Sequence, residues 1–260
     1  MLQLSNVSNT EIQKNMSRLK RFLEATSYRI NDDRIIIYIN ELKKIYRPKT
    51  VRHHLTTIKR FLRFVRYPSA ELIKPLRVPK RRKIVVKPDH IRKILEKADL
   101  QTKTAILVSA TSGIRAEELY KLTIEDIDIE GRIIYVRAEI AKDYEDRVTF
   151  FSVEAQRALE EYLSIRRSNS IYLFPEGTIR KKIRKYSKNL RIKHMRKFFS
   201  QQSDRLGMPT AIKKILMGHV VSNEEYVLSA SDIDLGHYDF QDEEDLKKIY
   251  DRYWKDFRVL

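Results

Sequence analysis

The residues of this sequence that could carry chemistry are tyrosines, cations and carboxylates. The chain has no cysteine, which removes thiolate nucleophiles, disulfides and zinc-thiolate sites. Its six histidines show no paired ligand spacing of the HExxH kind. A tyrosine hydroxyl becomes a nucleophile when a neighbour accepts its proton or when cations lower its pKa. We therefore expect chemistry carried by oxygen nucleophiles, cations and carboxylates, with no metal and no cofactor.

The charge balance indicates the partner on which such chemistry acts. Lys and Arg number 53 against 35 Asp and Glu, a formal net charge of +18. A heat-adapted surface would explain the high density of charge but not its sign. A polyanion is favoured because each phosphate that is neutralised releases condensed counterions, so nucleic acid is the predicted partner. The sequence has no apolar stretch of about 18 residues and no signal peptide, which predicts a cytoplasmic protein.

Two segments carry a resemblance to a known family. The segment TSGIRAEELYKLTIEDID at 111–128 resembles the first arginine box of tyrosine recombinases, the phage-type integrases: Gly, an apolar residue, Arg, two variable residues, Glu and Leu. This resemblance implies that Arg115 is a catalytic arginine and that Glu118 orients the site. The segment AKDYEDRV at 141–148 resembles the family's β-hairpin with a catalytic lysine, which implies that role for Lys142.

A third segment, at 192–219, resembles the family's His-x-x-Arg box and the Leu-Gly-His segment that follows it. The resemblance implies that Arg196 is the second catalytic arginine and that His219 belongs to the site. Lys193 stands where histidine is usual, a departure similar to integrases of archaeal viruses and plasmids. On a helix Lys193 shares the face of Arg196, whereas His194 lies about 200° round from it. We therefore assign Lys193 to the site and leave His194 open.

The nucleophile is expected after His219, where four tyrosines follow. Tyr250 and Tyr253 belong to an apolar stripe of the last helix and are predicted to pack in the core. Tyr226 and Tyr238 follow His219 by seven and nineteen residues, and neither spacing is the one usual in the family. We favour Tyr238, because the sequence around it resembles archaeal integrase tails, and keep Tyr226 as the alternative.

The reaction that this resemblance implies is site-specific recombination of double-stranded DNA through a 3′-phosphotyrosine intermediate. Family members assemble as homo-tetramers on two synapsed duplexes, and a monomer in free solution is compatible with that assembly. One alternative is a type IB topoisomerase, which uses the same attack. A second is a recombinase-derived DNA-binding protein without catalysis, and a third is a helical nucleic-acid scaffold with no active site.

The elements that must position these residues are mainly helical. Apolar residues recur at three-to-four spacing over most of the chain, and 132–140 and 147–153 read as two strands around a polar turn. The fold class predicted is mainly α with a small antiparallel β-hairpin or sheet (α+β). We expect a helical core-binding, DNA-binding domain at 1–75, a basic linker at 76–87, and a recombinase-type catalytic domain at 88–260.

Two further predictions concern aromatic and imidazole side chains. The helix at 50–67 has one apolar face and basic residues elsewhere, which indicates DNA contact on its outer side. His53 and His54 are expected to be surface or backbone-contact residues and not ligands of an ion, because adjacent helical residues point about 100° apart. Phe198 and Phe199 are expected to pack in the core, because large adjacent aromatic residues bury the most apolar area.

Overall fold

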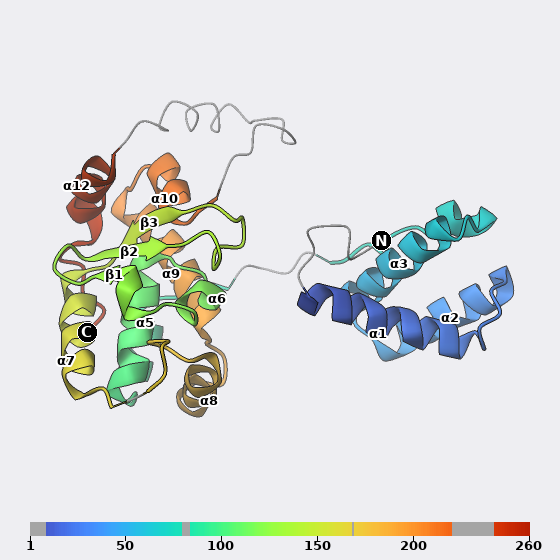
Figure 1. Cartoon of the computed structure of the whole chain (residues 1–260), viewed down its shortest axis with the longest axis horizontal. Helices are drawn as coiled ribbons and strands as arrows, with labels where there is room; N and C mark the ends of the chain where they lie inside the picture. Colours follow the sequence, from blue (N-terminus) through green and yellow to red (C-terminus); the bar gives the residue numbers. More distant parts are fainter. Residues whose placement is uncertain (1–8, 80–83, 168, 220–241) are drawn as a thin grey trace. The chain divides into compact units, whose positions relative to one another are not determined.

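The computed structural model describes residues 9–79, 84–167, 169–219 and 242–260 (Figure 1). The chain divides between Lys83 and Ile84 into two compact units. Each unit has its own cluster of buried apolar side chains. Each therefore has a core of its own and is described by itself.

In the first unit, the described residues 9–79 form three α-helices and a short 3-10 helix. Their bounds are α1 Asn9–Ala25, α2 Asp32–Ile45, α3 Pro48–Phe64 and η2 Pro68–Leu72. Helix α2 begins at Asn31, whose side chain accepts the backbone N–H of Arg34 and so satisfies one of the free donors of the first turn. Phe22 of α1 meets Tyr38 of α2 edge to face in the centre of this unit.

Helix α3 has the expected apolar face, but one of its histidines was misplaced. His53 is exposed, whereas His54 is buried, stacks on Tyr46 and lies 3.5 Å from the hydroxyl of Tyr38. The prediction that both histidines are surface or backbone-contact residues was therefore wrong for His54. Adjacent helical residues point about 100° apart, and one of these two directions faces the core. Arg52 and Arg60 remain exposed on the outer side of the helix.

The second unit contains eight α-helices, a one-turn 3-10 helix and three short strands among the residues that the structure describes. Their bounds are α4 Pro88–Leu95, α5 Leu100–Ser112, α6 Ala116–Leu119, η3 Ile124–Asp126, β1 Ile127–Asp128, β2 Ile133–Val136, β3 Arg147–Phe150, α7 Val153–Ile165, α8 Glu176–Tyr186, α9 Ile192–Leu206, α10 Thr210–Leu216 and α12 Glu243–Trp254.

The three strands form one antiparallel sheet in the order β1-β2-β3. The β2–β3 pair has Ile133 opposite Phe150 and Val136 opposite Arg147, so the pair is the hairpin expected from the sequence. The two-residue strand β1 was not predicted. Strand β2 ends at Val136, earlier than expected, because 137–146 forms the connecting turn.

Helix α5 is the centre of this unit and packs between α7 and α9 (Figure 1). From Thr104 to Ser112 every residue is buried. Its hydroxyl side chains fit this apolar setting because they donate to carbonyls one turn earlier, as Ser109 does to Ala105 and Ser112 to Val108. The helix therefore buries all its faces without leaving these hydroxyls unpaired.

The predicted fold class is confirmed: the chain is mainly helical with one small antiparallel sheet. In the described part of the chain, no helix is both long and apolar enough to cross a membrane.

Candidate active site

Arg115 is positioned by the sharp end of helix α5. The helix stops at Gly113, whose φ of +69° lies in the left-handed region. A Cβ at Gly113 would lie 2.4 Å from the ring of Phe199, so no residue with a side chain fits at this position. Two residues later Arg115 forms the N-cap of helix α6, with its side chain half-buried.

Glu118 is the buried ion-pair partner of Arg115. Its carboxylate accepts the backbone N–H of Arg115 at 2.9 Å and a guanidinium N–H at 2.8 Å, and it also accepts two N–H groups of Arg147 at 3.2 and 2.5 Å. Burial raises the pKa of Glu118, but hydrogen bonds and charge from Arg147 and Arg115 outweigh burial and hold that pKa below its ordinary value. Glu118 is thus a buried anion between two arginines.

Arg196 projects from helix α9 into the same cluster. Its guanidinium donates to the carbonyl of Gly113 at 2.7 Å and to that of Met217 at 2.5 Å. Within the described residues it forms no ion pair. Burial and the charges of Arg115 and Arg147 lower the pKa of Arg196 to about 10, so the side chain stays protonated at neutral pH. A half-buried positive charge held only by carbonyls attracts an anion.

His219 lies at the end of the next helix. Gly218 has a φ of +61°, and its carbonyl accepts an N–H of Arg115 at 2.6 Å. A Cβ on Gly218 would lie 2.7 Å from Arg147, so glycine is needed both for the turn and for this contact. His219 is exposed to solvent, but desolvation by the protein atoms around its ring, followed by the charges of Arg196 and Arg115, lowers its pKa, which favours the neutral, proton-accepting form of its imidazole.

Lys142 lies in the turn between β2 and β3 with its side chain exposed. The next residue, Asp143, forms an ion pair with Arg115 at 2.9 Å. We call Arg115, Arg147 and Arg196 the arginine cluster. Asp143 therefore links the turn to this cluster, whereas the Lys142 side chain makes no contact with it that the structure describes.

Lys193 and His194 occupy different surroundings. Lys193 is exposed on α9 and lines a depression of about 310 Å³ together with Ala116, Tyr120 and Arg191. His194 is buried, and its Nδ1 accepts the backbone N–H of Arg191, which caps the first turn of α9. His194, the residue left open in the sequence, is therefore a buried residue that caps α9.

The tyrosines of the C-terminal region divide into two groups. Tyr250 is fully buried in α12, and its hydroxyl donates to the carbonyl of Thr111 at 2.9 Å. Burial raises the pKa of Tyr250 well above its ordinary value, which disfavours the phenolate that attack requires. Tyr253 is partly buried against the same core. Tyr226 and Tyr238 lie outside the described residues.

The site thus brings together Arg115, Arg196 and His219 and holds Lys142 next to them. Sequence reasoning missed Asp143 and Arg147, the two residues that link the hairpin to Arg115 and Glu118. Their signal was weak, because a charged residue in a polar turn usually faces solvent. In the described part of the chain, no group of three or more His, Asp or Glu is placed to hold a metal ion.

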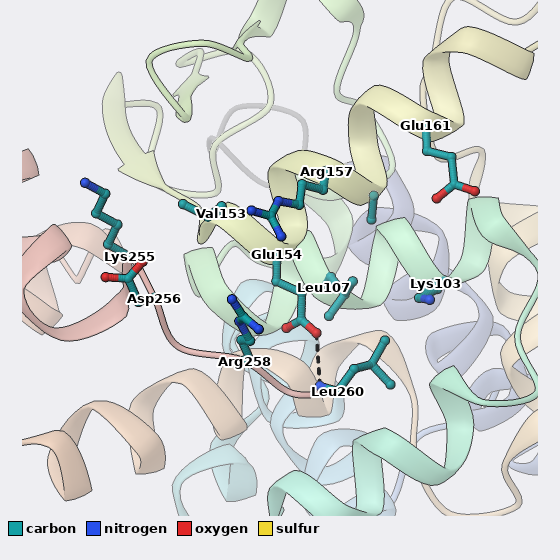
Figure 2. A pocket seen from close by; sticks show the side chains of 11 residues that line it. Lys103, Leu107, Val153, Glu154, Arg157, Glu161, Lys255, Asp256, Arg258 and Leu260 are labelled. Atoms are coloured by element: carbon teal, nitrogen blue, oxygen red, sulfur yellow. Dashed lines mark hydrogen bonds between the residues drawn. The ribbon is translucent and has the colours of Figure 1, made fainter.

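A second cavity, of about 320 Å³, lies elsewhere in this unit and contains none of these residues. It is lined mainly by charged side chains of α7 and of the C-terminal residues, such as Arg157 and Arg258. Figure 2 shows the Glu154 carboxylate accepting the backbone N–H of Leu260 beside it, and Glu154 also accepts that of Val259. The cavity therefore lies beside the hydrogen bonds that join the C-terminal residues to α7.

The fold, mainly helical with one small antiparallel sheet, is that of the tyrosine recombinase class. Residues 85–223 match the model of the phage integrase family, which is more than half of the chain. The chain belongs to the phage integrase family, whose members are enzymes of site-specific DNA recombination.

Two curated relatives come from archaea. The chain is 27% identical over 235 residues to tyrosine recombinase XerA of Pyrococcus horikoshii, covering 84% of this chain and 82% of that protein. It is 28% identical over 187 residues to tyrosine recombinase XerA of Saccharolobus solfataricus, covering 68% and 62%. This agrees with the archaeal character expected from the Lys193 departure.

Solved structures show the same fold. A lambda integrase (75–356) dimer bound to a COC′ core site aligns with a TM-score of 0.68 at 14% identity, covering 85% of this chain and 88% of that one. The Tn1549 transposon integrase in complex with transposon right end DNA aligns with a TM-score of 0.60 at 16% identity, covering 95% of each chain.

Proposed function

We propose that this recombinase cleaves and rejoins double-stranded DNA with Tyr238 as nucleophile and Arg115 and Arg196 as the phosphate-binding pair. The tyrosine oxygen bonds to phosphorus, and the bond from phosphorus to the 5′-oxygen breaks, which leaves a 3′-phosphotyrosine. A 5′-hydroxyl of a second strand reverses the step. The bond energy is retained in the intermediate, so the exchange needs no external energy source.

The single observation that carries this proposal is the Arg196 guanidinium, which lies beside Arg115 and forms no ion pair among the described residues. Both guanidinium groups are oriented by fixed acceptors, the carbonyls of Gly113, Met217 and Gly218. A trigonal-bipyramidal phosphorus builds charge on its nonbridging oxygens, and donors that are already oriented stabilise that charge without reorganisation. Two arginines held in this way favour a phosphodiester over an uncharged substrate.

Two groups are proposed to move the protons. His219, with its lowered pKa, accepts the proton of the tyrosine hydroxyl. Lys142 gives a proton to the departing 5′-oxygen, since the turn that carries it adjoins Arg115 through Asp143. Lys193 is assigned to hold a phosphate oxygen as a hydrogen-bond donor, because it lines the depression that begins at Ala116, next to Arg115.

The assembly is also proposed. The first unit, with exposed Arg52 and Arg60 on α3, is proposed to bind the duplex as a core-binding domain. Four copies are proposed to synapse two duplexes, in keeping with the fold's likeness to a lambda integrase tetramer bound to a Holliday junction. The relatives are named recombinases, which favours strand exchange over topoisomerase activity.

The experiment uses a duplex that the protein itself selects from random-sequence DNA, nicked so that cleavage traps the intermediate. Arg196→Lys keeps the positive charge and loses the planar fork. We expect DNA binding within about threefold of wild type and a fall in the single-turnover cleavage rate of about a hundredfold or more. Arg205→Lys, on the same helix, is the matched control and should cleave normally. Equal cleavage by Arg196→Lys and wild type would contradict the proposal.

A further inference from the structure

The ion pair between Asp143 and Arg115 is the more exposed of the two ion pairs that Arg115 makes among the described residues. Arg115 already has a buried carboxylate partner in Glu118, whose side chain is 1% exposed. Asp143, on the turn between β2 and β3, accepts from the other terminal nitrogen of Arg115, Nη2 rather than Nη1, and its side chain is 26% exposed. The two carboxylates therefore differ: that of Glu118 is buried and that of Asp143 is partly exposed.

The carboxylate of Asp143 also acts on the other cations of the site. Its charge counteracts the lowering of the pKa of both Arg196 and His219, so it lies within electrostatic reach of each. The Asp143 carboxylate thus pairs with Arg115 and acts electrostatically on Arg196 and His219. In the proposed reaction, the position of this carboxylate belongs to a nonbridging oxygen of the phosphate.

Lys142 precedes Asp143 directly in the chain, so whatever holds Asp143 holds the backbone of Lys142. The structure describes no contact between the Lys142 side chain and the cluster. A Lys142 side chain that protonates the leaving oxygen must therefore move from its position in this structure, and the Asp143 contact restrains the turn that carries it.

We propose that Asp143 is a positioning residue that holds the place of a phosphate oxygen at Arg115 and, in the same contact, keeps the turn of Lys142 away from the reacting atoms until DNA is bound. This inference rests on the proposed roles of Arg115 and Lys142. When a phosphate arrives, its charge repels the Asp143 carboxylate and takes over the guanidinium. The turn is then released, and Lys142 becomes free to reach the 5′-oxygen.

The first test measures binding of inorganic phosphate to the free, full-length protein, through the fluorescence of Trp254 during thermal unfolding. Trp254 is the one tryptophan and is buried in the second unit. Asp143→Asn keeps the shape of the side chain and removes its charge. We expect Asp143→Asn to bind phosphate about three- to tenfold more tightly than wild type, the range expected for loss of one partly exposed ion-pair competitor.

The matched control is Glu145→Gln, which makes the same change of net charge in the same turn at an exposed residue. It should bind phosphate as wild type does. Equal tightening in both variants would mean a general effect of net charge and would overturn the inference, as would no change in Asp143→Asn.

The second test measures release of the turn by mapping chymotrypsin cleavage after Tyr144, whose side chain is 71% exposed. In wild type, phosphate should accelerate cleavage at Tyr144, because Asp143 leaves Arg115. In Asp143→Asn cleavage should already be fast without phosphate. Protection of Tyr144 by phosphate in wild type would overturn the inference.

A third measurement separates this inference from the proposed function. On the selected nicked duplex, Asp143→Asn should reach half-maximal cleavage at a lower DNA concentration, by about the factor found for phosphate. If neither wild type nor Asp143→Asn cleaves DNA while the phosphate and proteolysis results are as expected, the proposed function fails. The placeholder role of Asp143, that is, its occupation of the phosphate-oxygen position at Arg115, then still stands. If DNA is cleaved and Asp143→Asn needs as much DNA as wild type, the placeholder role fails alone.

Discussion

Replacement of Glu118 by glutamine is the change for which the structure gives the clearest energetic expectation. The carboxylate is buried and accepts hydrogen bonds from Arg115 and from Arg147, whose side chains are 20% and 10% exposed. Glutamine has nearly the same shape but no charge, and its amide N–H₂ cannot accept a bond from a guanidinium. The substitution therefore leaves a buried Arg147 without its anion.

The expected loss of stability follows from the cost of such an orphaned charge. Breaking a buried ion pair by removing one partner costs about 3–5 kcal/mol. The remaining carbonyl of glutamine can still accept the backbone N–H of Arg115, so we expect the lower part of that range, about 3 kcal/mol. The Nε of Arg147 is buried with no partner among the described residues, so this guanidinium depends on Glu118 for its compensation.

The assay is urea unfolding followed by the fluorescence of Trp254, which reports on the second unit because it is the one tryptophan of the chain. Glu117→Gln is the control: it removes the same charge from the neighbouring, exposed residue of α6. A loss below about 1 kcal/mol for Glu118→Gln, or a loss equal to that of the control, would refute the reasoning.

The ion pairs of Glu118 with Arg115 and Arg147 also predict that stability depends on pH. The pKa of Glu118 is below its ordinary value of 4.5 in the folded protein, because the two arginines outweigh burial. A lowered pKa in the folded state contributes stability that is fully present above the unfolded-state pKa and is lost as pH falls through the folded-state pKa. Wild type should therefore lose stability below about pH 4.5, and Glu118→Gln should lack this part of the acid dependence.

Three further predictions concern neighbouring residues. Tyr250→Phe removes the hydrogen bond to Thr111 and should lower the free energy of unfolding by about 1 kcal/mol with cleavage intact; loss of the covalent adduct would show instead that Tyr250 is the nucleophile. Gly218→Ala forces a Cβ against Arg147 in a left-handed turn, so unfolding in urea should show a loss of at least about 1–2 kcal/mol, with slower cleavage. The cleavage rate should have an acid limb below pH 6.5, set by the lowered pKa of His219, and His219→Asn should abolish that limb; a limb unchanged in the variant contradicts the role of base.

The sequence predicted the helical fold and the hairpin because both depend on local patterns. Apolar residues at three-to-four spacing define most helices, and the polar turn at 143–146 separates two runs of β-branched and aromatic residues. Phe198 and Phe199 were confirmed as core residues, each 0% exposed. Strand β1 was missed because two residues are too short a run to show alternation.

The placement of the candidate residues depended on contacts that no local pattern encodes. Arg115 and Arg196 converge because α5 ends at Gly113 and α9 packs against it, a consequence of tertiary structure. The roles of Asp143 and Arg147 arise across more than twenty residues of sequence from Arg115 and Glu118. His54 was misplaced for the same reason, since its burial depends on the packing of α2 against α3.

The central claim is that one tyrosine after His219 becomes joined to DNA. The direct measurement is to trap the covalent complex on the nicked, protein-selected duplex and to identify the modified peptide by mass spectrometry, in wild type, Tyr238→Phe and Tyr226→Phe. The account predicts an adduct on Tyr238 that disappears only in Tyr238→Phe. An adduct on Tyr226 would contradict the assignment of the nucleophile, and no adduct on a duplex that the protein binds and selects would contradict the catalytic account itself.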